Sequence, residues 1–155
     1  MKLLVFSDSH GYHLKMLSAI ELSKPDMLVH LGDGGRDVSK IEAQFPQIPL
    51  RAVRGNCDMG SVLPDTDFFQ AGKAKIFISH GHLYGVKVTL SALVDDARVR
   101  GANIVMFGHT HIAKFAMSGG IYVLNPGTCG LAASPSCAEV IIDDKGEISC
   151  NLIRL

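Results

Sequence analysis

The stretch KLLVFSDSH, residues 2–10, changes from an apolar run to polar side chains at Ser7. The apolar part, residues 2–6, is too short for a helix and is rich in Leu, Val and Phe, which is typical of a buried strand. It is also too short for a signal peptide or a membrane span. We therefore expect a first buried strand that ends in Asp8 and His10.

The same change from apolar to polar residues occurs four more times along the chain. Further apolar runs lie at residues 27–31, 50–53, 75–78 and 103–107. They lead into Gly32-Asp33, Gly55-Asn56-Cys57-Asp58, His80-Gly81-His82 and Gly108-His109-Thr110-His111. In an open α/β sheet the carboxyl ends of the strands lie along one edge, where ligands bind. We therefore expect all five polar segments to converge on one site.

Helical patterns separate these predicted strands. Apolar residues recur at three- or four-residue spacing in three sets: Leu14, Leu17 and Ile20; Val38, Ile41 and Phe45; Leu90, Leu93, Val94 and Ala97. After residue 112, the runs KFAM and IYVL flank Ser-Gly-Gly, and AEVIID and EISCNLI flank Asp-Lys-Gly, which is typical of antiparallel hairpins. The predicted fold class is α/β, a two-sheet β-sandwich flanked by helices.

The composition limits the function classes. The 155 residues are about the size of one domain, and 15 basic and 15 acidic residues leave no net charge. This balance argues against a general affinity for nucleic acid or acidic membranes. The four cysteines (Cys57, Cys129, Cys137 and Cys150) include no C-x-x-C pair. We interpret them as free thiols in a reducing compartment and expect a cytoplasmic protein.

The polar segments contain a set of metal-ligand types. Asp8 and His10, like His109 and His111, are two residues apart, so in an extended chain their side chains would leave on one side. The full set of nitrogen and oxygen donors is Asp8, His10, Asp33, Asn56, His80, His109 and His111. Seven donors suit two ions that share a bridging carboxylate. Imidazole and carboxylate together favour manganese, the expected ion, or iron, zinc, nickel or cobalt, over magnesium or calcium.

The ordered series Asp8-x-His10, Gly32-Asp33, Gly55-Asn56-x-Asp58, His80 and Gly108-His109-x-His111 resembles the calcineurin-like metallophosphoesterases, and most of all their small phosphodiesterase branch. The resemblance covers nearly the whole chain and implies one metallophosphoesterase domain, residues 1–155, with a four-layer α/β/β/α fold. It implies that one metal is held by Asp8, His10 and His111, the other by Asn56, His80 and His109, and that Asp33 bridges both.

The resemblance also implies a mechanism. A metal-bridging hydroxide would attack phosphorus in line, while both cations and His109 offset charge on the phosphoryl oxygens. On this basis the catalytic group is His109, Asp33 and Asn56. The expected enzyme is a dinuclear-metal phosphodiesterase that acts on a small phosphodiester substrate.

The other histidines have different interpretations. His30 lies within its predicted strand, so we expect it to be packed and hydrogen-bonded, and His13, on the first predicted helix, should face solvent. His82 follows His80 by two residues; a substrate-side or supporting role is our hypothesis for it. Asp58 could orient a neighbouring residue or the loop, or simply stabilise a turn. The turn Asn125-Pro126-Gly127-Thr128 should lie near the cleft.

Cys57 has three competing interpretations. A nucleophilic thiolate would need a nearby base, but the histidines are committed to metal. A thiolate ligand would be an eighth donor. The third interpretation is substitution, because many relatives carry at this position a histidine that helps protonate the leaving group or bind the phosphoryl oxygens. Without that imidazole, diesters should be preferred over monoesters, which need more help from a general acid.

Two alternatives remain beside the phosphodiesterase. One is a non-catalytic protein-interaction module on the same fold, since a retromer subunit resembles this branch; lost ligands would mark it, and none of the donors is missing. The other is a phosphomonoesterase or nuclease. Neutral charge and few aromatic residues (three Tyr, seven Phe, no Trp) argue against an extended nucleic-acid surface. No membrane partner is expected, and a homo-oligomer is an open alternative to a monomer.

Overall fold

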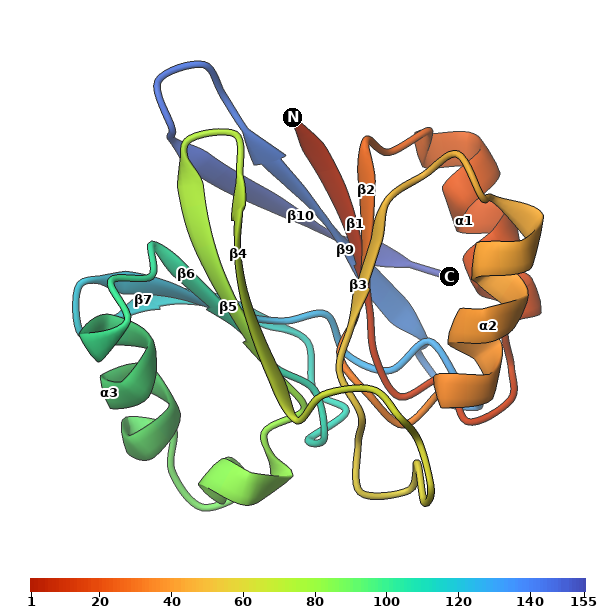
Figure 1. The fold of residues 1–155 in the computed structure, drawn as a ribbon, viewed down its shortest axis with the longest axis horizontal. Coiled ribbons are helices and arrows are strands. Elements are labelled where there is room, and N and C mark those ends of the chain that lie inside the picture. The colour runs from red at the N-terminus through yellow and green to blue at the C-terminus, as the bar shows by residue number, and fades with distance from the viewer.

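β1 (Lys2–Phe6) is the middle strand of the first of two five-stranded sheets in the computed structural model, which describes all 155 residues (Figure 1). β2 (Met27–His30) pairs parallel with β1, and β3 (Leu50–Ala52) pairs parallel with β2. On the other side of β1 lies the antiparallel hairpin of β9 (Ser136–Ile142) and β10 (Ile148–Arg154). Helices α1 (Leu14–Ser23) and α2 (Gly35–Gln44) connect the parallel strands.

The second sheet has the order β4-β5-β6-β8-β7. Its elements are β4 (Thr66–Ala71), β5 (Ala74–Ser79), β6 (Ile104–Met106), β7 (Lys114–Ser118) and β8 (Ile121–Asn125). The middle strands β5, β6 and β8 are parallel, and the edge strands β4 and β7 are antiparallel to their neighbours. A 3₁₀ turn (His82–Tyr84) and α3 (Ser91–Val99) connect β5 to β6.

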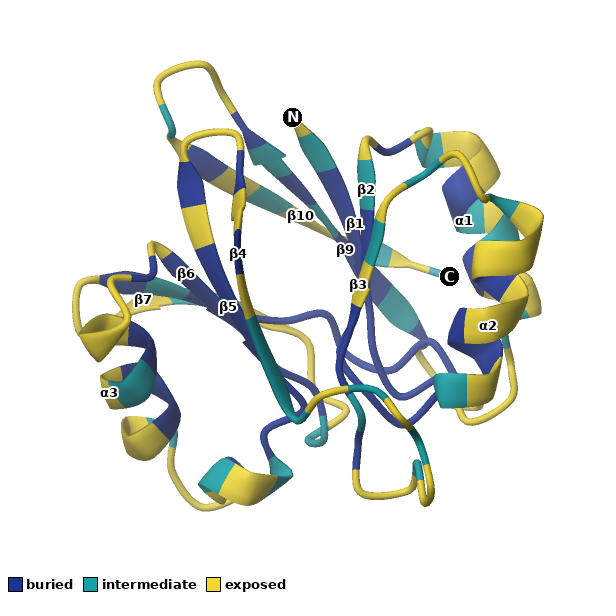
Figure 2. Ribbon diagram, in the orientation of Figure 1, coloured by how far each residue is buried: buried dark blue, intermediate teal, exposed yellow.

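The core has three apolar layers. Side chains from both sheets, among them Leu3 and Val5 of β1, form the central layer of 17 buried residues. The alternate residues of the same strand, Leu4 and Phe6, pack instead against α1 and α2, and the opposite face of the second sheet packs against α3. Figure 2 shows each helix with one buried side. Because successive side chains of a strand point to opposite faces, a strand covered on both faces needs an unbroken apolar run.

The predicted architecture is confirmed: two sheets lie face to face with helices outside, and β7-β8 and β9-β10 are hairpins. One strand was missed. β4 is an edge strand whose sequence, TDFFQA, mixes polar and apolar residues, and it forms a hairpin with β5. Such a strand needs only one buried face, so it lacks the apolar run that marks the inner strands. No helix combines the length and apolar character that a membrane span requires.

Candidate metal centre

The loops that follow β1, β2, β3, β5 and β6 meet at the lower centre of Figure 1, where both sheets end. Backbone hydrogen bonds tie these loops together. Asp8 N–H donates to Gly32 O at 3.0 Å, and Gly108 N–H donates to His80 O at 3.1 Å. His109 N–H donates to Asp8 Oδ2 at 3.1 Å, which joins the loops of the two sheets. The predicted convergence on one edge is therefore present.

The backbone is strained at the donor residues. Five of the six non-glycine residues with positive φ are candidate donors: Asp8 (56°), His10 (45°), Asp33 (57°), His109 (65°) and His111 (59°). A left-handed conformation costs about 1–2 kcal/mol per residue and persists where the surroundings impose it, often at functional sites. The expectation of an extended chain at Asp8-x-His10 and His109-x-His111 was wrong, because each of these residues turns sharply to aim its side chain.

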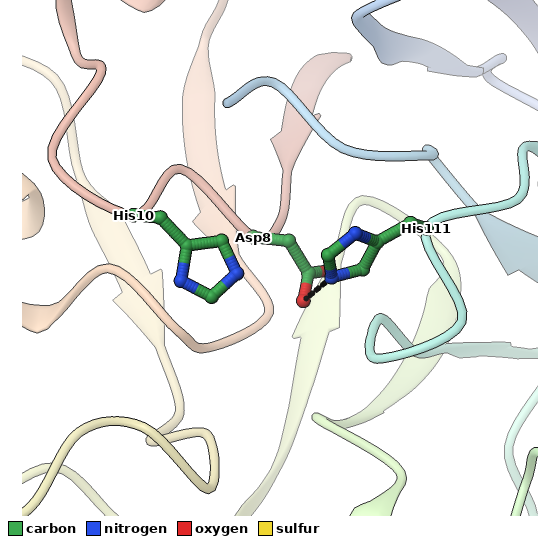
Figure 3. A group of neighbouring side chains, drawn as sticks. All are labelled: Asp8, His10 and His111. Atoms are coloured by element: carbon green, nitrogen blue, oxygen red, sulfur yellow. Dashed lines mark ion pairs between the residues drawn. The ribbon is translucent and has the colours of Figure 1, made fainter. Parts of the chain in front are cut away.

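Asp8, His10 and His111 form the first group of donors (Figure 3). Their ligand atoms lie within 4.8 Å of one another, and His111 Nε2 is 3.1 Å from Asp8 Oδ1. Asp8 is fully buried; its Oδ2 accepts hydrogen bonds from Ser7 and from the His109 N–H, but its Oδ1 has no hydrogen-bond partner. A buried carboxylate oxygen without a donor is costly unless a cation occupies the place in front of it.

The second group is the set that the resemblance implies for the other metal, His80, Asn56 and His109. In the structure the ligand atoms of His80 also lie within 4.8 Å of those of Asp8 and Asp33. His80 Nδ1 lies 2.7 Å from the carbonyl oxygen of Leu31, a contact that fixes the ring and directs Nε2 into the site. Nε2 is 3.2 Å from Asn56 Oδ1, and the His80 and His109 ring centroids are 5.0 Å apart.

Asp33 lies between the two groups. Its Oδ2 is 3.5 Å from His80 Nε2 in the second group and 3.9 Å from His10 Nε2 in the first. One oxygen of Asp33 therefore lies within 3.9 Å of ring nitrogens in both groups, and Asp8 Oδ1 likewise lies 3.1 Å from His111 Nε2 and 4.0 Å from His80 Nε2.

The charged groups of the site shift one another's pKa values. Burial acts to raise the pKa of Asp33, but His80 and the N–H of Cys57 outweigh it and lower that pKa below its usual range. Burial acts to lower the pKa of His80, but the carboxylates of Asp33 and Asp8 raise it above the usual value. Burial, His80 and then Lys87 lower the pKa of His109. Two buried carboxylates thus draw positive charge into the site, where a metal ion would displace the His80 proton.

Asp58 holds two of these loops together. Its side chain accepts hydrogen bonds from the backbone N–H groups of Asp33, Gly35 and Gly55, each at 2.8 Å. The hypothesis of a loop-orienting carboxylate is confirmed, and the stabilised segment includes Asp33 itself.

Asp37 was missed by the sequence analysis. It lies on α2, is 1% exposed, and its Oδ2 accepts hydrogen bonds from Ser9 Oγ at 2.6 Å and from Gly11 N–H at 2.7 Å. These bonds fix the loop on both sides of His10. No local signal could have found this role, because the partners are 26 and 28 residues away. His13 does not face solvent as expected: its Nδ1 lies 3.6 Å from Asp37 Oδ1 and the side chain is 22% exposed.

His30 and the turn after β8 lie where the sequence predicts. His30 is buried, lies 3.2 Å from Ser9 Oγ through Nε2 and accepts from Gly32 N–H, so the packed interpretation is confirmed. The turn after β8 also lies at the cleft: Asn125 Nδ2 donates to Gly108 O at 2.9 Å, and Thr128 Oγ1 donates to Asp8 O at 2.8 Å. The His82 ring centroid is 5.3 Å from that of His80, beside the second group.

Cys57 is exposed at the edge of the site. Its N–H donates to Asp33 Oδ1 at 2.7 Å, and its Sγ lies within 4.8 Å of ligand atoms of His10 and Asp33. Burial and the Asp33 carboxylate raise the pKa of its thiol. A raised pKa disfavours the thiolate that a nucleophile requires. His10, Asp33 and Cys57 together form a third group of possible ligands. The interpretation of Cys57 as a metal ligand is therefore compatible with the geometry.

The comparisons with known proteins point the same way. Residues 1–145 match a family model described as calcineurin-like phosphoesterase superfamily domain. The chain is 36% identical to the probable metallophosphoesterase YsnB of Bacillus subtilis over 134 residues, covering 84% of this chain and 76% of the relative. It is 31% identical to the phosphodiesterase YfcE of Escherichia coli K12 over 155 residues, covering 84% and 80%.

Solved structures share the fold. The crystal structure of a predicted phosphoesterase from Streptococcus pneumoniae has a TM-score of 0.80 and 26% identity, with 99% of this chain and 97% of that chain covered. Zn²⁺-complexed Vps29 from Entamoeba histolytica has a TM-score of 0.78 and 23% identity, with 99% of each chain covered. The second similarity is one of fold alone.

Proposed function

Because this chain belongs to the calcineurin-like phosphoesterase superfamily, we propose that it is a phosphodiesterase that hydrolyses small phosphodiesters at a dinuclear metal centre. The family and the two relatives identify a phosphoesterase, and one of them carries the name phosphodiesterase. The observation that carries the metal-dependent part of the proposal is the buried Asp8 Oδ1, which has no hydrogen-bond partner and faces His111.

The donor groups define the proposed metal sites. Asp8, His10 and His111 would hold one ion, and Asn56, His80 and His109 the other, with Asp33 shared between them. The short contacts of Asp33 to both groups support its bridging role. Mixed nitrogen and oxygen donors favour a divalent transition metal; manganese is our choice, with iron, zinc, nickel or cobalt as alternatives.

The chemistry follows from the donors and their neighbours. When bound, the two ions supply an acidified water as nucleophile and positive charge beside the phosphoryl oxygens. His80, fixed by Leu31, and Asp33, fixed by Cys57 N–H and Asp58, hold the donor set in one geometry. His109 adds an imidazole near the phosphoryl oxygens. Cys57 carries a thiol of raised pKa, which is protonated at neutral pH but is a poorer general acid than an imidazole with a pKa near neutral. Diesters with acidic leaving groups therefore fit the site best.

A second candidate function is a protein-interaction module, which the similarity in fold to Vps29 favours. The presence of all seven donors argues for the hydrolase. The four cysteines are free, which supports a reducing, cytoplasmic location as part of the proposal.

Metal analysis combined with paired assays tests the proposal. The native protein, loaded with Mn²⁺, should hydrolyse bis(p-nitrophenyl) phosphate faster than p-nitrophenyl phosphate. Asp33→Asn should lower diester hydrolysis by at least about a hundredfold, because the shared ligand loses its charge. Full activity of that variant would rule out the bridging role. A native protein that binds no metal and hydrolyses neither ester with any divalent cation would favour the interaction module.

A further inference from the structure

We propose that the preferred substrates are asymmetric phosphodiesters whose retained arm carries a negative charge, and that this arm binds in a cavity between α3 and β7. The inference rests on the proposed function and names the substrate class for the same site. It concerns the surroundings of the donor groups, which form two cavities of unlike chemistry.

Two cavities lie beside the loops that carry the donors. One, of about 780 Å³, is lined by His10, Asp33 and Cys57 together with α2 and the loop after Asp58. The other, of about 840 Å³, is lined by residues 86–91, α3 and β7 and includes Thr110, which lies between the donors His109 and His111. The cavities share no lining residue, and Figure 1 shows α2 and α3 on opposite sides of the molecule. A phosphodiester at the metal centre therefore has a separate cavity for each of its two ester arms.

The cavity beside α3 has an apolar floor and a basic rim. Buried Val86, Val94 and Phe107 line the floor. The rim carries three cations, Lys87, Arg98 and Lys114, and only one carboxylate, Asp95. Arg98 Nη1 pairs with Asp95 Oδ1 at 3.7 Å, whereas Lys87 and Lys114 are exposed and have no carboxylate partner. This combination suits an arm with an apolar body and an anionic end.

The cavity beside α2 has no excess of cations. Its lining includes one cation, Arg36, and the carboxylates Asp33, Asp37, Glu42 and Asp58. Asp33 is a proposed metal ligand, and Asp37 and Asp58 accept backbone hydrogen bonds, so the exposed charges of this cavity are those of Arg36 and Glu42. An anionic arm gains less there than beside the three cations of the other cavity. The cavity beside α3 is therefore the one that favours a negatively charged substrate arm.

Cys57 assigns the arms. In the proposed function the leaving group departs beside Cys57, and Cys57 lines the cavity beside α2. The leaving group therefore occupies the cavity beside α2, and the arm that stays on phosphorus occupies the cavity beside α3. In the reaction the P–O bond to the first arm breaks, water supplies the new P–O bond, and the products are the alcohol or phenol and a monoester of the second arm.

A matched pair of substrates tests the inference. p-Nitrophenyl phenyl phosphate and p-nitrophenyl 4-carboxyphenyl phosphate release the same p-nitrophenolate and differ only in the charge of the retained arm. The native Mn²⁺-loaded protein should prefer the carboxyphenyl ester by about fivefold or more in kcat/KM, mainly through KM, since an exposed ion pair contributes at the scale of a few-fold each. Lys87→Met combined with Lys114→Met should abolish the preference, and Lys145→Met, on the distant β9-β10 hairpin, should keep it.

Binding to the metal-free protein gives a readout that is independent of hydrolysis. 4-Carboxyphenyl phosphate should shift the NMR resonances of the backbone amides of Ser91, Thr110 and Gly119, and leave those of Ser61 and Val62 in place. Equal rates for both esters, or the same preference in the double lysine variant, would overturn the inference while hydrolysis itself continues. If neither ester is hydrolysed but the amides beside α3 shift, the proposed function fails and the anion-binding cavity stands. No shift there would overturn the cavity as well.

Discussion

The Oδ2 atom of Asp58 accepts a hydrogen bond of 2.8 Å from the backbone N–H of Asp33. The same side chain accepts hydrogen bonds from the backbone N–H groups of Gly35 and Gly55. One carboxylate therefore fixes the loops after β2 and β3 relative to each other. Asp58→Asn removes one of the two acceptor oxygens and the charge. We expect the free energy of unfolding to fall by about 2 kcal/mol, since hydrogen bonds to a charged group contribute about 1.5–3 kcal/mol each.

The metal affinity of Asp58→Asn should fall by about 10- to 100-fold, because residues that orient ligands have effects of this size. Denaturant unfolding and calorimetric metal titration measure the two quantities. Asp144→Asn, on the exposed turn between β9 and β10, is the control and should change neither. Native metal affinity in Asp58→Asn would show that the loop keeps Asp33 in place without this carboxylate.

Asp8 should be a stability cost to the metal-free protein. Its buried Oδ1 has no hydrogen-bond partner, and its Oδ2 already accepts from Ser7 and His109. Asp8→Asn keeps one oxygen for those donors and removes a buried charge, so we expect the melting temperature of the metal-free protein to rise by several degrees. Mn²⁺ should raise the melting temperature of the native protein but not of the variant. A variant that melts lower than native without metal would show that the charge is already compensated.

His30 should make the stability depend on pH. Burial lowers its pKa from 6.5 to about 4. Between these pH values the unfolded chain binds a proton that the folded protein does not, so stability is highest above pH 6.5 and falls as the pH is lowered toward 4. The His30 contribution is about 3 kcal/mol over this window. In denaturant unfolding at pH 7 and pH 4.5, His30→Gln should lose less stability on acidification than the native protein. An equal loss in both would assign the acid sensitivity to other groups.

The convergence of the site could be predicted from the sequence, because Asp8, Asp33 and His80 each follow an apolar run and parallel strands end at a common edge. The details depend on contacts between distant residues. Asp37 reaches Ser9 across 28 residues, and no spacing rule describes such a bond. The left-handed φ of His10 is likewise imposed by its surroundings, since a positive φ is uncommon for every residue except glycine.

Substitutions at Cys57 test whether this position lacks a general acid for the leaving group. The larger contribution of Cys57 to Asp33 is made by the backbone N–H, which survives any side-chain change except proline. Cys57→Ala should therefore keep diester hydrolysis within about threefold of native. Cys57→His should raise the ratio of monoester to diester hydrolysis by about tenfold or more, because a positioned general acid contributes about 10²–10⁴-fold when fully effective.

The matched control for Cys57→His is Met59→His, which adds an imidazole to an exposed position of the same cavity. It should leave the ratio unchanged, because an imidazole two residues further on is not held beside Asp33. Hydrolysis of p-nitrophenyl phosphate and bis(p-nitrophenyl) phosphate by each Mn²⁺-loaded variant measures the ratio. Loss of all hydrolysis in Cys57→Ala, with metal content retained, would make the thiol a direct participant. Loss of metal in that variant would instead make it the eighth ligand, since its Sγ already lies within 4.8 Å of ligand atoms of His10 and Asp33.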